Sequence, residues 1–206
     1  MKGNFQVRFG ERSGETRRLQ DRKVRPAPTL RTGGFLVETF NYWHSRNGSR
    51  LDRSSYEESQ LIGIKDRDLC RLATALFEII APGKYVIKNA NSLDMIALRQ
   101  NDVISEEFQA DVVLTNPPFG AKIGITQQSI LRQYELGKHW NFIASDNKWI
   151  STNRFRTSQD PQILFIELCV KLLKPGGILG IILPEGVFGN RKGGYVWDFL
   201  RDYGEI

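Results

Sequence analysis

Four consecutive residues, Asn116-Pro117-Pro118-Phe119, combine groups that could hold a planar amine. The prolines lack an N–H and fix φ, so they predict a rigid turn whose carbonyl groups remain available as acceptors. Asn116 adds a side-chain acceptor before this turn, and Phe119 adds a flat ring after it. We therefore expect the amine hydrogens to go to Asn116 Oδ1 and the Pro117 carbonyl, while Phe119 stacks on the ring that carries the amine.

Such acceptors would draw the nitrogen lone pair out of conjugation and make it nucleophilic toward a methyl sulfonium. If the amine belongs to a base in a duplex, the base must be flipped out, at a cost of a few kcal/mol. Positioning would supply much of the rate, because no general base with a matched pKa is obvious. The alternative is that the two prolines merely end a strand, with Asn116 acting as a turn former.

The segments around this motif would place it at the end of a strand. Strands are expected over residues 61–64, 85–87, 111–115 and 178–183, and helices over residues 35–47, 69–80, 162–173 and from about residue 195. Strands that are apolar throughout and alternate with helices predict a parallel, doubly wound α/β sheet. Ligands bind beyond the carboxyl ends of such strands, which is where the unusual residues fall.

Residues 120–159 form a long polar stretch between the motif and the next helix. Such a length exceeds a simple connection, so we predict a functional loop or lid. Trp140, Phe142 and Trp149 could pack on DNA or on a flipped base, or could stabilise the stretch as an aromatic patch. We favour the second interpretation.

The positive charge is concentrated at the start of the chain. The 206 residues carry a net charge of +6. Residues 1–31 hold nine Lys/Arg and three Asp/Glu, and the remainder holds twenty of each sign. A basic surface is therefore weak support for DNA binding. Residues 1–31 also lack hydrophobic periodicity, so we predict an irregular or disordered Arg-rich segment, separate from residues 32–206.

Several functional classes are not supported by the composition. No stretch reaches the roughly 20 apolar residues of a membrane span, and nothing resembles a secretory signal, so we expect a cytoplasmic protein. Cys70 and Cys169 fall in apolar helical patterns and are expected to be buried thiols. His44 and His139 are isolated, so no metal site is expected.

Residues 111–120 resemble motif IV of amino-methyltransferases, and residues 32–206 resemble the methylation (M) subunits of type I restriction–modification systems. The resemblance extends to Gln162–Glu167, Leu173-Lys174-Pro175-Gly176-Gly177 and Ile181–Gly186, in the same order. It implies a doubly wound, Rossmann-like core dependent on S-adenosylmethionine (SAM), incomplete at both ends of this partial domain. It further implies methylation of adenine N6 in double-stranded DNA, with the adenine flipped out, beside specificity and restriction subunits.

The same resemblance assigns roles to individual residues. Asn116, Pro117, Pro118 and Phe119 would form the catalytic motif. Residues near the carboxyl ends of the first strands would bind SAM: Thr32, Gly33, Gly34, Phe35, Asp66, Asn91, Ser92 and Leu93. Asp66 would bind the ribose or cap the following helix, and Asn91 would contact the adenine ring or serve as a turn residue.

The chain departs from this family at the first cofactor loop. Residues 25–34 lack the acidic residue and the first glycine of that loop, and no apolar strand precedes them. One alternative is therefore a truncated, catalytically inactive fragment. Another is an amino-methyltransferase that acts on a protein glutamine or an rRNA guanine, although those enzymes usually resemble Asn-Pro-Pro-Tyr.

Overall fold

The computed structural model describes residues 34–47, 62–65, 67–80, 86–118, 124–189 and 193–203. The chain divides into two compact units, of which one ends at Ser92 and the other begins at Leu93. The Arg-rich segment predicted over residues 1–31 lies outside the described residues.

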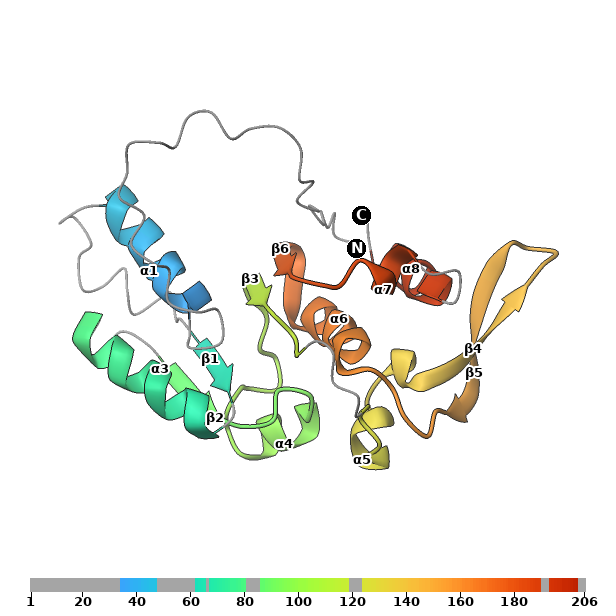
Figure 1. Cartoon of the computed structure of the whole chain (residues 1–206), viewed down its shortest axis with the longest axis horizontal. Helices are drawn as coiled ribbons and strands as arrows, with labels where there is room; N and C mark the ends of the chain where they lie inside the picture. Colours follow the sequence, from blue (N-terminus) through green and yellow to red (C-terminus); the bar gives the residue numbers. More distant parts are fainter. Residues whose placement is uncertain are drawn as a thin grey trace. The chain divides into compact units, whose positions relative to one another are not determined.

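In the described residues, the first unit contains parallel strands and helices (Figure 1). Its elements are α1 (Gly34–Asn47), β1 (Ile62–Lys65), α3 (Arg67–Ile80) and β2 (Val86–Asn89). β1 and β2 pair in parallel, and α3 packs against both strands. Ala73 and Phe77 lie four residues apart on the buried face of α3, as the periodicity predicts. Leu72, which precedes Ala73, is 52% exposed.

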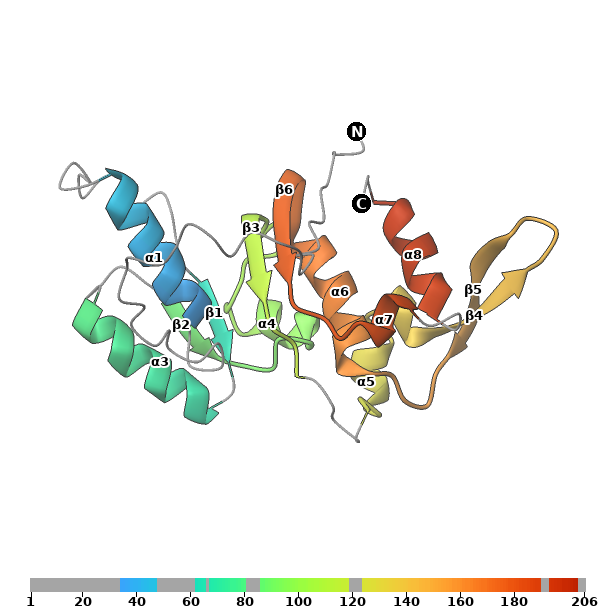
Figure 2. The same ribbon diagram turned by 45° about the horizontal axis from the view of Figure 1, so that its top comes forward.

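The second unit contains a parallel pair of strands, an antiparallel hairpin and several helices (Figure 2). Its elements are α4 (Met95–Gln100), β3 (Ala110–Thr115), α5 (Gln128–Leu131), the 3-10 helix η3 (Glu135–Gly137), β4 (Lys138–Ile143), β5 (Lys148–Phe155), α6 (Pro161–Leu172), β6 (Leu173–Ile181), α7 (Gly186–Gly189) and α8 (Gly194–Arg201). β3 pairs with β6 in parallel, and β4 pairs with β5 to form the hairpin.

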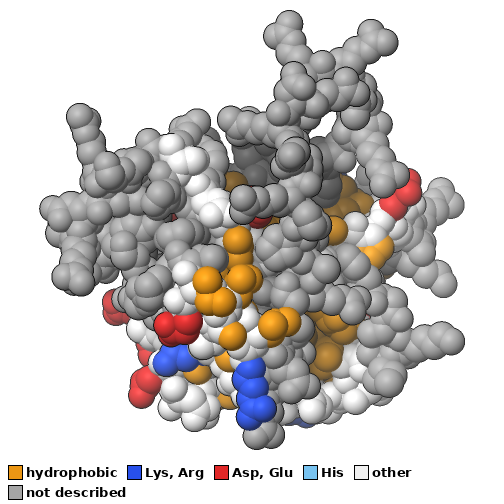
Figure 3. All heavy atoms as spheres, turned by 60° about the vertical axis from the view of Figure 1, so that its left-hand side comes forward, with side chains coloured by type: hydrophobic (Ala, Val, Ile, Leu, Met, Phe, Trp, Pro, Cys, Tyr) orange, Lys and Arg blue, Asp and Glu red, His pale blue; other side chains and the backbone are white. Residues whose placement is uncertain are grey.

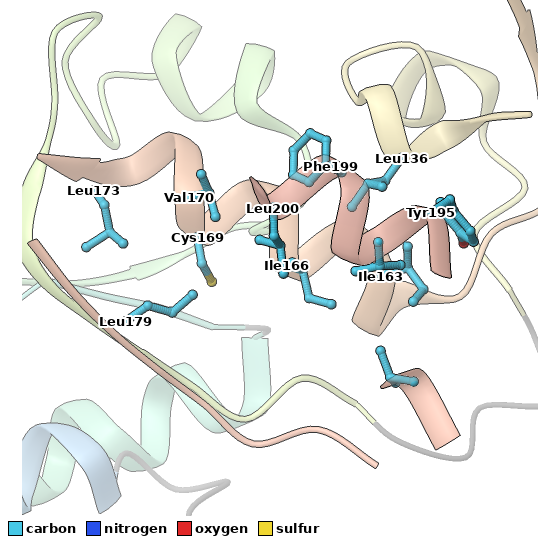
Figure 4. Packing of buried hydrophobic residues seen from close by; sticks show 12 residues of the cluster. Leu136, Ile163, Ile166, Cys169, Val170, Leu173, Leu179, Tyr195, Phe199 and Leu200 are labelled. Carbon is cyan, nitrogen blue, oxygen red and sulfur yellow. The ribbon is translucent and has the colours of Figure 1, made fainter. Parts of the chain in front are cut away.

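The core of the second unit lies where α6 meets the β3–β6 pair and α8. Figure 4 shows side chains of α6 and α8 close together, among them Ile166 and Leu200. Cys169 is also in this cluster, and burial raises the pKa of its thiol to about 12, in line with the expected inert thiol. Cys70 is only half-buried. No helix in the described ranges could cross a membrane.

One face of the β3–β6 pair is exposed, contrary to our prediction of strands buried on both faces. α6 packs against Val113 and Leu179 on the other face. On the exposed face, Val112 is 51% and Ile178 is 60% accessible. Figure 3 shows that hydrophobic side chains also reach the surface on one side of the molecule.

The bounds of β6 also differ from the prediction. We expected a strand over residues 178–183, after a Lys-Pro-Gly-Gly turn. In the structure β6 begins at Leu173 because this residue pairs with Ala110 before the register shifts. Gly176 lies within the irregular part at φ +80°, a conformation that glycine adopts without strain.

The prediction of a loop or lid over residues 120–159 is wrong for residues 124–159. This stretch folds into α5, η3 and the hairpin, and it buries Leu131, Tyr134 and Leu136. Trp140 and Trp149 pack against the core, which confirms the interpretation of these aromatic residues as a stabilising patch. The stretch contributes few apolar residues to the core, since most residues of the core cluster belong to α6 and α8. Its polar composition therefore did not indicate that it is folded.

A buried carboxylate ties this stretch to α6. Glu167 is fully buried, and its two oxygens accept the backbone N–H groups of Glu135 (2.9 Å) and Leu136 (2.7 Å). Lys171, one turn further along α6, lies 2.7 Å from the same carboxylate. Each oxygen therefore has a donor, which offsets the cost of burying the charge.

We predict that Glu167→Ala destabilises the protein by about 3–5 kcal/mol, because two backbone donors and the Lys171 charge lose their acceptor. Urea unfolding followed by circular dichroism measures this change. The matched control is Glu107→Ala, which removes an exposed carboxylate and should shift stability by less than about 0.5 kcal/mol. Equal stability of the two variants would contradict this stabilising role of the Glu167 carboxylate.

Candidate functional site

The Asn-Pro-Pro motif begins at the carboxyl end of β3. The backbone carbonyl of Thr115 accepts the Ile182 N–H (3.1 Å), the last bond between the two chain segments in the described residues. Asn116 follows directly, and its Oδ1 is buried without a hydrogen-bond partner in the part of the chain described here. A buried acceptor without a donor costs about 1–3 kcal/mol, so its presence calls for a functional explanation.

The two prolines differ in burial, which makes the turn both anchored and accessible. Pro117 is almost fully buried, whereas Pro118 is exposed. Neither can donate a backbone hydrogen bond, so the turn offers acceptors only. Phe119, the predicted stacking residue, lies outside the described residues.

A second segment ends at the same edge as the motif. The parallel register pairs Thr115 with Ile181, so the residues after β6 leave the sheet beside Asn116. There the Pro184 carbonyl accepts the Val187 N–H (3.0 Å), which turns the chain into α7. We expected no site role for residues 182–185, although the Leu-Pro-Glu-Gly run after an apolar strand could have indicated one.

The predicted cofactor residues belong mainly to the first unit. Gly34, which is buried, and Phe35 begin α1. Asn91 and Ser92 follow β2 in a turn, and the Asn91 side chain is exposed. Thr32, Gly33 and Asp66 lie outside the described residues.

The register of β1 and β2 brings the carboxyl ends of both strands to one edge, because Lys65 pairs with Asn89. Asn91 and Ser92 therefore follow β2 at this edge. Leu93 belongs to the second unit. Its side chain is buried, and its carbonyl accepts the Tyr134 hydroxyl (2.8 Å).

Comparison with known proteins identifies the family. Residues 17–195 match the family model described as N-6 DNA methylase. The chain belongs to the N-6 DNA methylase family. Among curated proteins, it is 25% identical over 168 residues to the type I restriction enzyme EcoEI methylase subunit of Escherichia coli. The alignment covers 79% of this chain and 28% of that protein.

The comparison with solved structures confirms the predicted fold class. A crystal structure from Listeria monocytogenes, assigned to the class I SAM-dependent methyltransferases, matches with a TM-score of 0.57 at 18% identity. The match covers 83% of this chain and 42% of that chain. The chain therefore has the Rossmann-like fold of class I methyltransferases, and it spans less than half the length of either relative.

We predict that Asn116→Ala leaves the folded methylase as stable as the wild type, or up to about 2 kcal/mol more stable, because it removes a buried acceptor that has no donor. The matched control is Asn101→Ala. Asn101 Nδ2 donates to the Ala97 carbonyl (2.8 Å), so its loss should cost up to about 1 kcal/mol. Thermal unfolding of both variants measures these changes. A larger loss of stability for Asn116→Ala than for Asn101→Ala would indicate that the Asn116 side chain has a structural hydrogen-bond partner.

Proposed function

We propose that this chain is a catalytic core that transfers a methyl group from SAM to the N6 amine of adenine in DNA. The observation that carries the proposal is the buried, unpartnered Oδ1 of Asn116 beside two prolines. An exocyclic amine would supply the missing donor. Membership of the N-6 DNA methylase family supports adenine as the base that presents the amine.

The residues of the motif would act by holding the nitrogen. Asn116 Oδ1 and the Pro117 carbonyl would accept its two hydrogens and direct its lone pair away from the base. Bound SAM would supply an electrophilic methyl group, and the nitrogen held by Asn116 and Pro117 would be placed to accept it as the sulfonium leaves as a neutral thioether. The nitrogen becomes positively charged during this step, and both acceptors stabilise that charge. The proton then leaves to solvent.

The residues at the edge of β1 and β2 provide groups that fit SAM. The start of α1 at Gly34 offers backbone N–H groups for the carboxylate of SAM. Asn91 presents an amide suited to the adenine ring, and Asp66 presents a carboxylate suited to the ribose hydroxyls. Residues 25–34 contain no acidic side chain for the SAM amino group, so this end of the site would rely on backbone carbonyls.

The biological setting is a further part of the proposal. We infer that the chain works in a type I restriction–modification complex, where specificity and restriction subunits accompany it and the target adenine is flipped from double-stranded DNA. The similarity to a type I methylase subunit supports this role. Such a complex acts on intracellular DNA, so the protein would be cytoplasmic.

One observation favours a second candidate, a methyltransferase fold without catalysis. The absence of acidic residues from positions 25–34 removes a group that the family uses for SAM. Such a chain would fold and contact partner subunits without binding the cofactor. Cofactor binding therefore separates the two candidates.

We expect calorimetric titration of the folded chain with SAM to show micromolar binding, and Asn91→Ala to weaken it at least tenfold because the adenine loses its amide partner. The matched control is Asn153→Ala, which removes an exposed amide from the hairpin and should bind SAM as the wild type does. Absence of heat from folded wild-type protein would favour the inactive fold.

We expect the chain, supplied with partner subunits where required, to transfer labelled methyl to unmodified DNA. Asn116→Ala should reduce transfer at least 100-fold, roughly 2.7 kcal/mol of lost transition-state stabilisation, and leave SAM affinity within a few-fold. Labelling of RNA or protein in place of DNA would favour the guanine or glutamine alternative. Equal turnover by the variant would remove Asn116 from the mechanism.

A further inference from the structure

The hairpin formed by β4 and β5 extends beyond the rest of the second unit in both ribbon views (Figures 1 and 2). Its two faces differ in chemistry, because partners across the strands share a face. Trp140 pairs with Ser151, and Phe142 pairs with Trp149, on the inner face. Asn141 pairs with Ile150 on the outer face.

The inner face fixes the hairpin to α8. The ring of Trp140 lies 5.9 Å from that of Tyr195, and the ring of Trp149 lies 6.1 Å from it. The backbone N–H of Trp149 donates to the buried carboxylate of Asp198 (2.7 Å). A Cβ added to Gly194 would lie 2.7 Å from Trp149 Nε1, so the helix approaches the hairpin closely. These contacts fix the position of the hairpin against α8.

The outer face carries donors and positive charge. By the alternation of the paired residues it includes Asn141, Lys148 and Ile150. Arg154 lies beyond the register shift of β5 and contributes a further exposed cation to the hairpin. No residue of either strand on this face is acidic. Within the described residues, the side chains of Lys148 and Arg154 are exposed and form no ion pair. Their charge is thus available to a polyanion.

We propose that this outer face binds duplex DNA, an inference that rests on the proposed function. A two-stranded ribbon fits the major groove of B-DNA, which is about 12 Å wide. Lys148 and Arg154 lie near opposite ends of β5, so their charges flank the middle of the hairpin. Each of the two cations can contact a phosphate of the DNA backbone.

The middle of the outer face suits the bases between those phosphates. Asn141 supplies an amide, and Ile150, 48% exposed, supplies an apolar surface. Amide and apolar side chains are two of the kinds of group that contact base edges in the major groove. Charge complementarity favours DNA over a protein partner, because phosphates line every duplex whatever its sequence.

The test measures binding of a labelled DNA duplex to the full chain by fluorescence anisotropy across a salt series. Each phosphate contact adds about 0.9 to the slope of log affinity against log salt concentration. Lys148→Ala/Arg154→Ala should therefore lower the slope by nearly two and weaken binding about tenfold or more at low salt. SAM binding should not change, which shows that the variant is folded.

The control is Arg71→Ala/Lys174→Ala, which removes the same charge from exposed positions outside the hairpin. It should retain nearly the full salt slope. Equal slopes for the two double variants would overturn the proposal, as would a Lys148/Arg154 variant that binds DNA normally but fails to assemble with partner subunits. If the wild type methylates DNA but the hairpin variant has the same salt slope as the control variant, the proposed function stands and the proposed DNA contact of the hairpin fails. If the wild type neither binds nor methylates DNA, both fail.

Discussion

β3 and β6 run in the same direction, so the chain that joins them must return to the starting end of the sheet before β6 begins. α6 makes that return and packs on one face of the pair. α5, η3 and the hairpin occupy the earlier part of the same connection. The pairing also sets the site, because the register of Thr115 with Ile181 places the Asn-Pro-Pro turn beside the segment that leads into α7.

Buried polar groups of the second unit are mostly paired, which makes the exception informative. Glu167 and Asp198 accept backbone N–H groups, and Gln159 Nε2 donates to the Leu136 carbonyl (2.6 Å). In the described residues, two buried side-chain atoms lack a hydrogen-bond partner, Asn116 Oδ1 and Arg99 Nε. Arg99 lies 3.4 Å from the Glu106 carboxylate, which compensates its charge, whereas no described residue donates to Asn116 Oδ1. The unpaired acceptor lowers stability at the position where we propose that a substrate amine binds.

The connection between β3 and β6 provides both the contacts that fix the hairpin in place and the surface that the hairpin exposes. Glu167 holds η3 against α6, and Asp198 holds the backbone of Trp149 against α8. The two contacts secure the hairpin at its base and along its inner face. On its inner face Trp140 and Trp149 pack against the core, whereas Phe142 is 48% exposed. The register determines which residues lie on the outer face, where a partner could bind.

The sequence alone predicted α1, α3, α6 and α8, the strands β1, β2, β3 and β6, and the motif, because these depend on local periodicity and on the stiffness of consecutive prolines. The same information led to the right fold class and family. It missed α4, α5, α7 and the hairpin, and it misjudged the exposed face at Val112 and Ile178 and the start of β6, since burial and pairing depend on residues distant in the chain. Only the tertiary structure showed that Asn116 Oδ1 is buried without a partner among the described residues and that Lys148 and Arg154 are exposed without an ion pair. Both properties arise from strand register and packing, which no local pattern encodes.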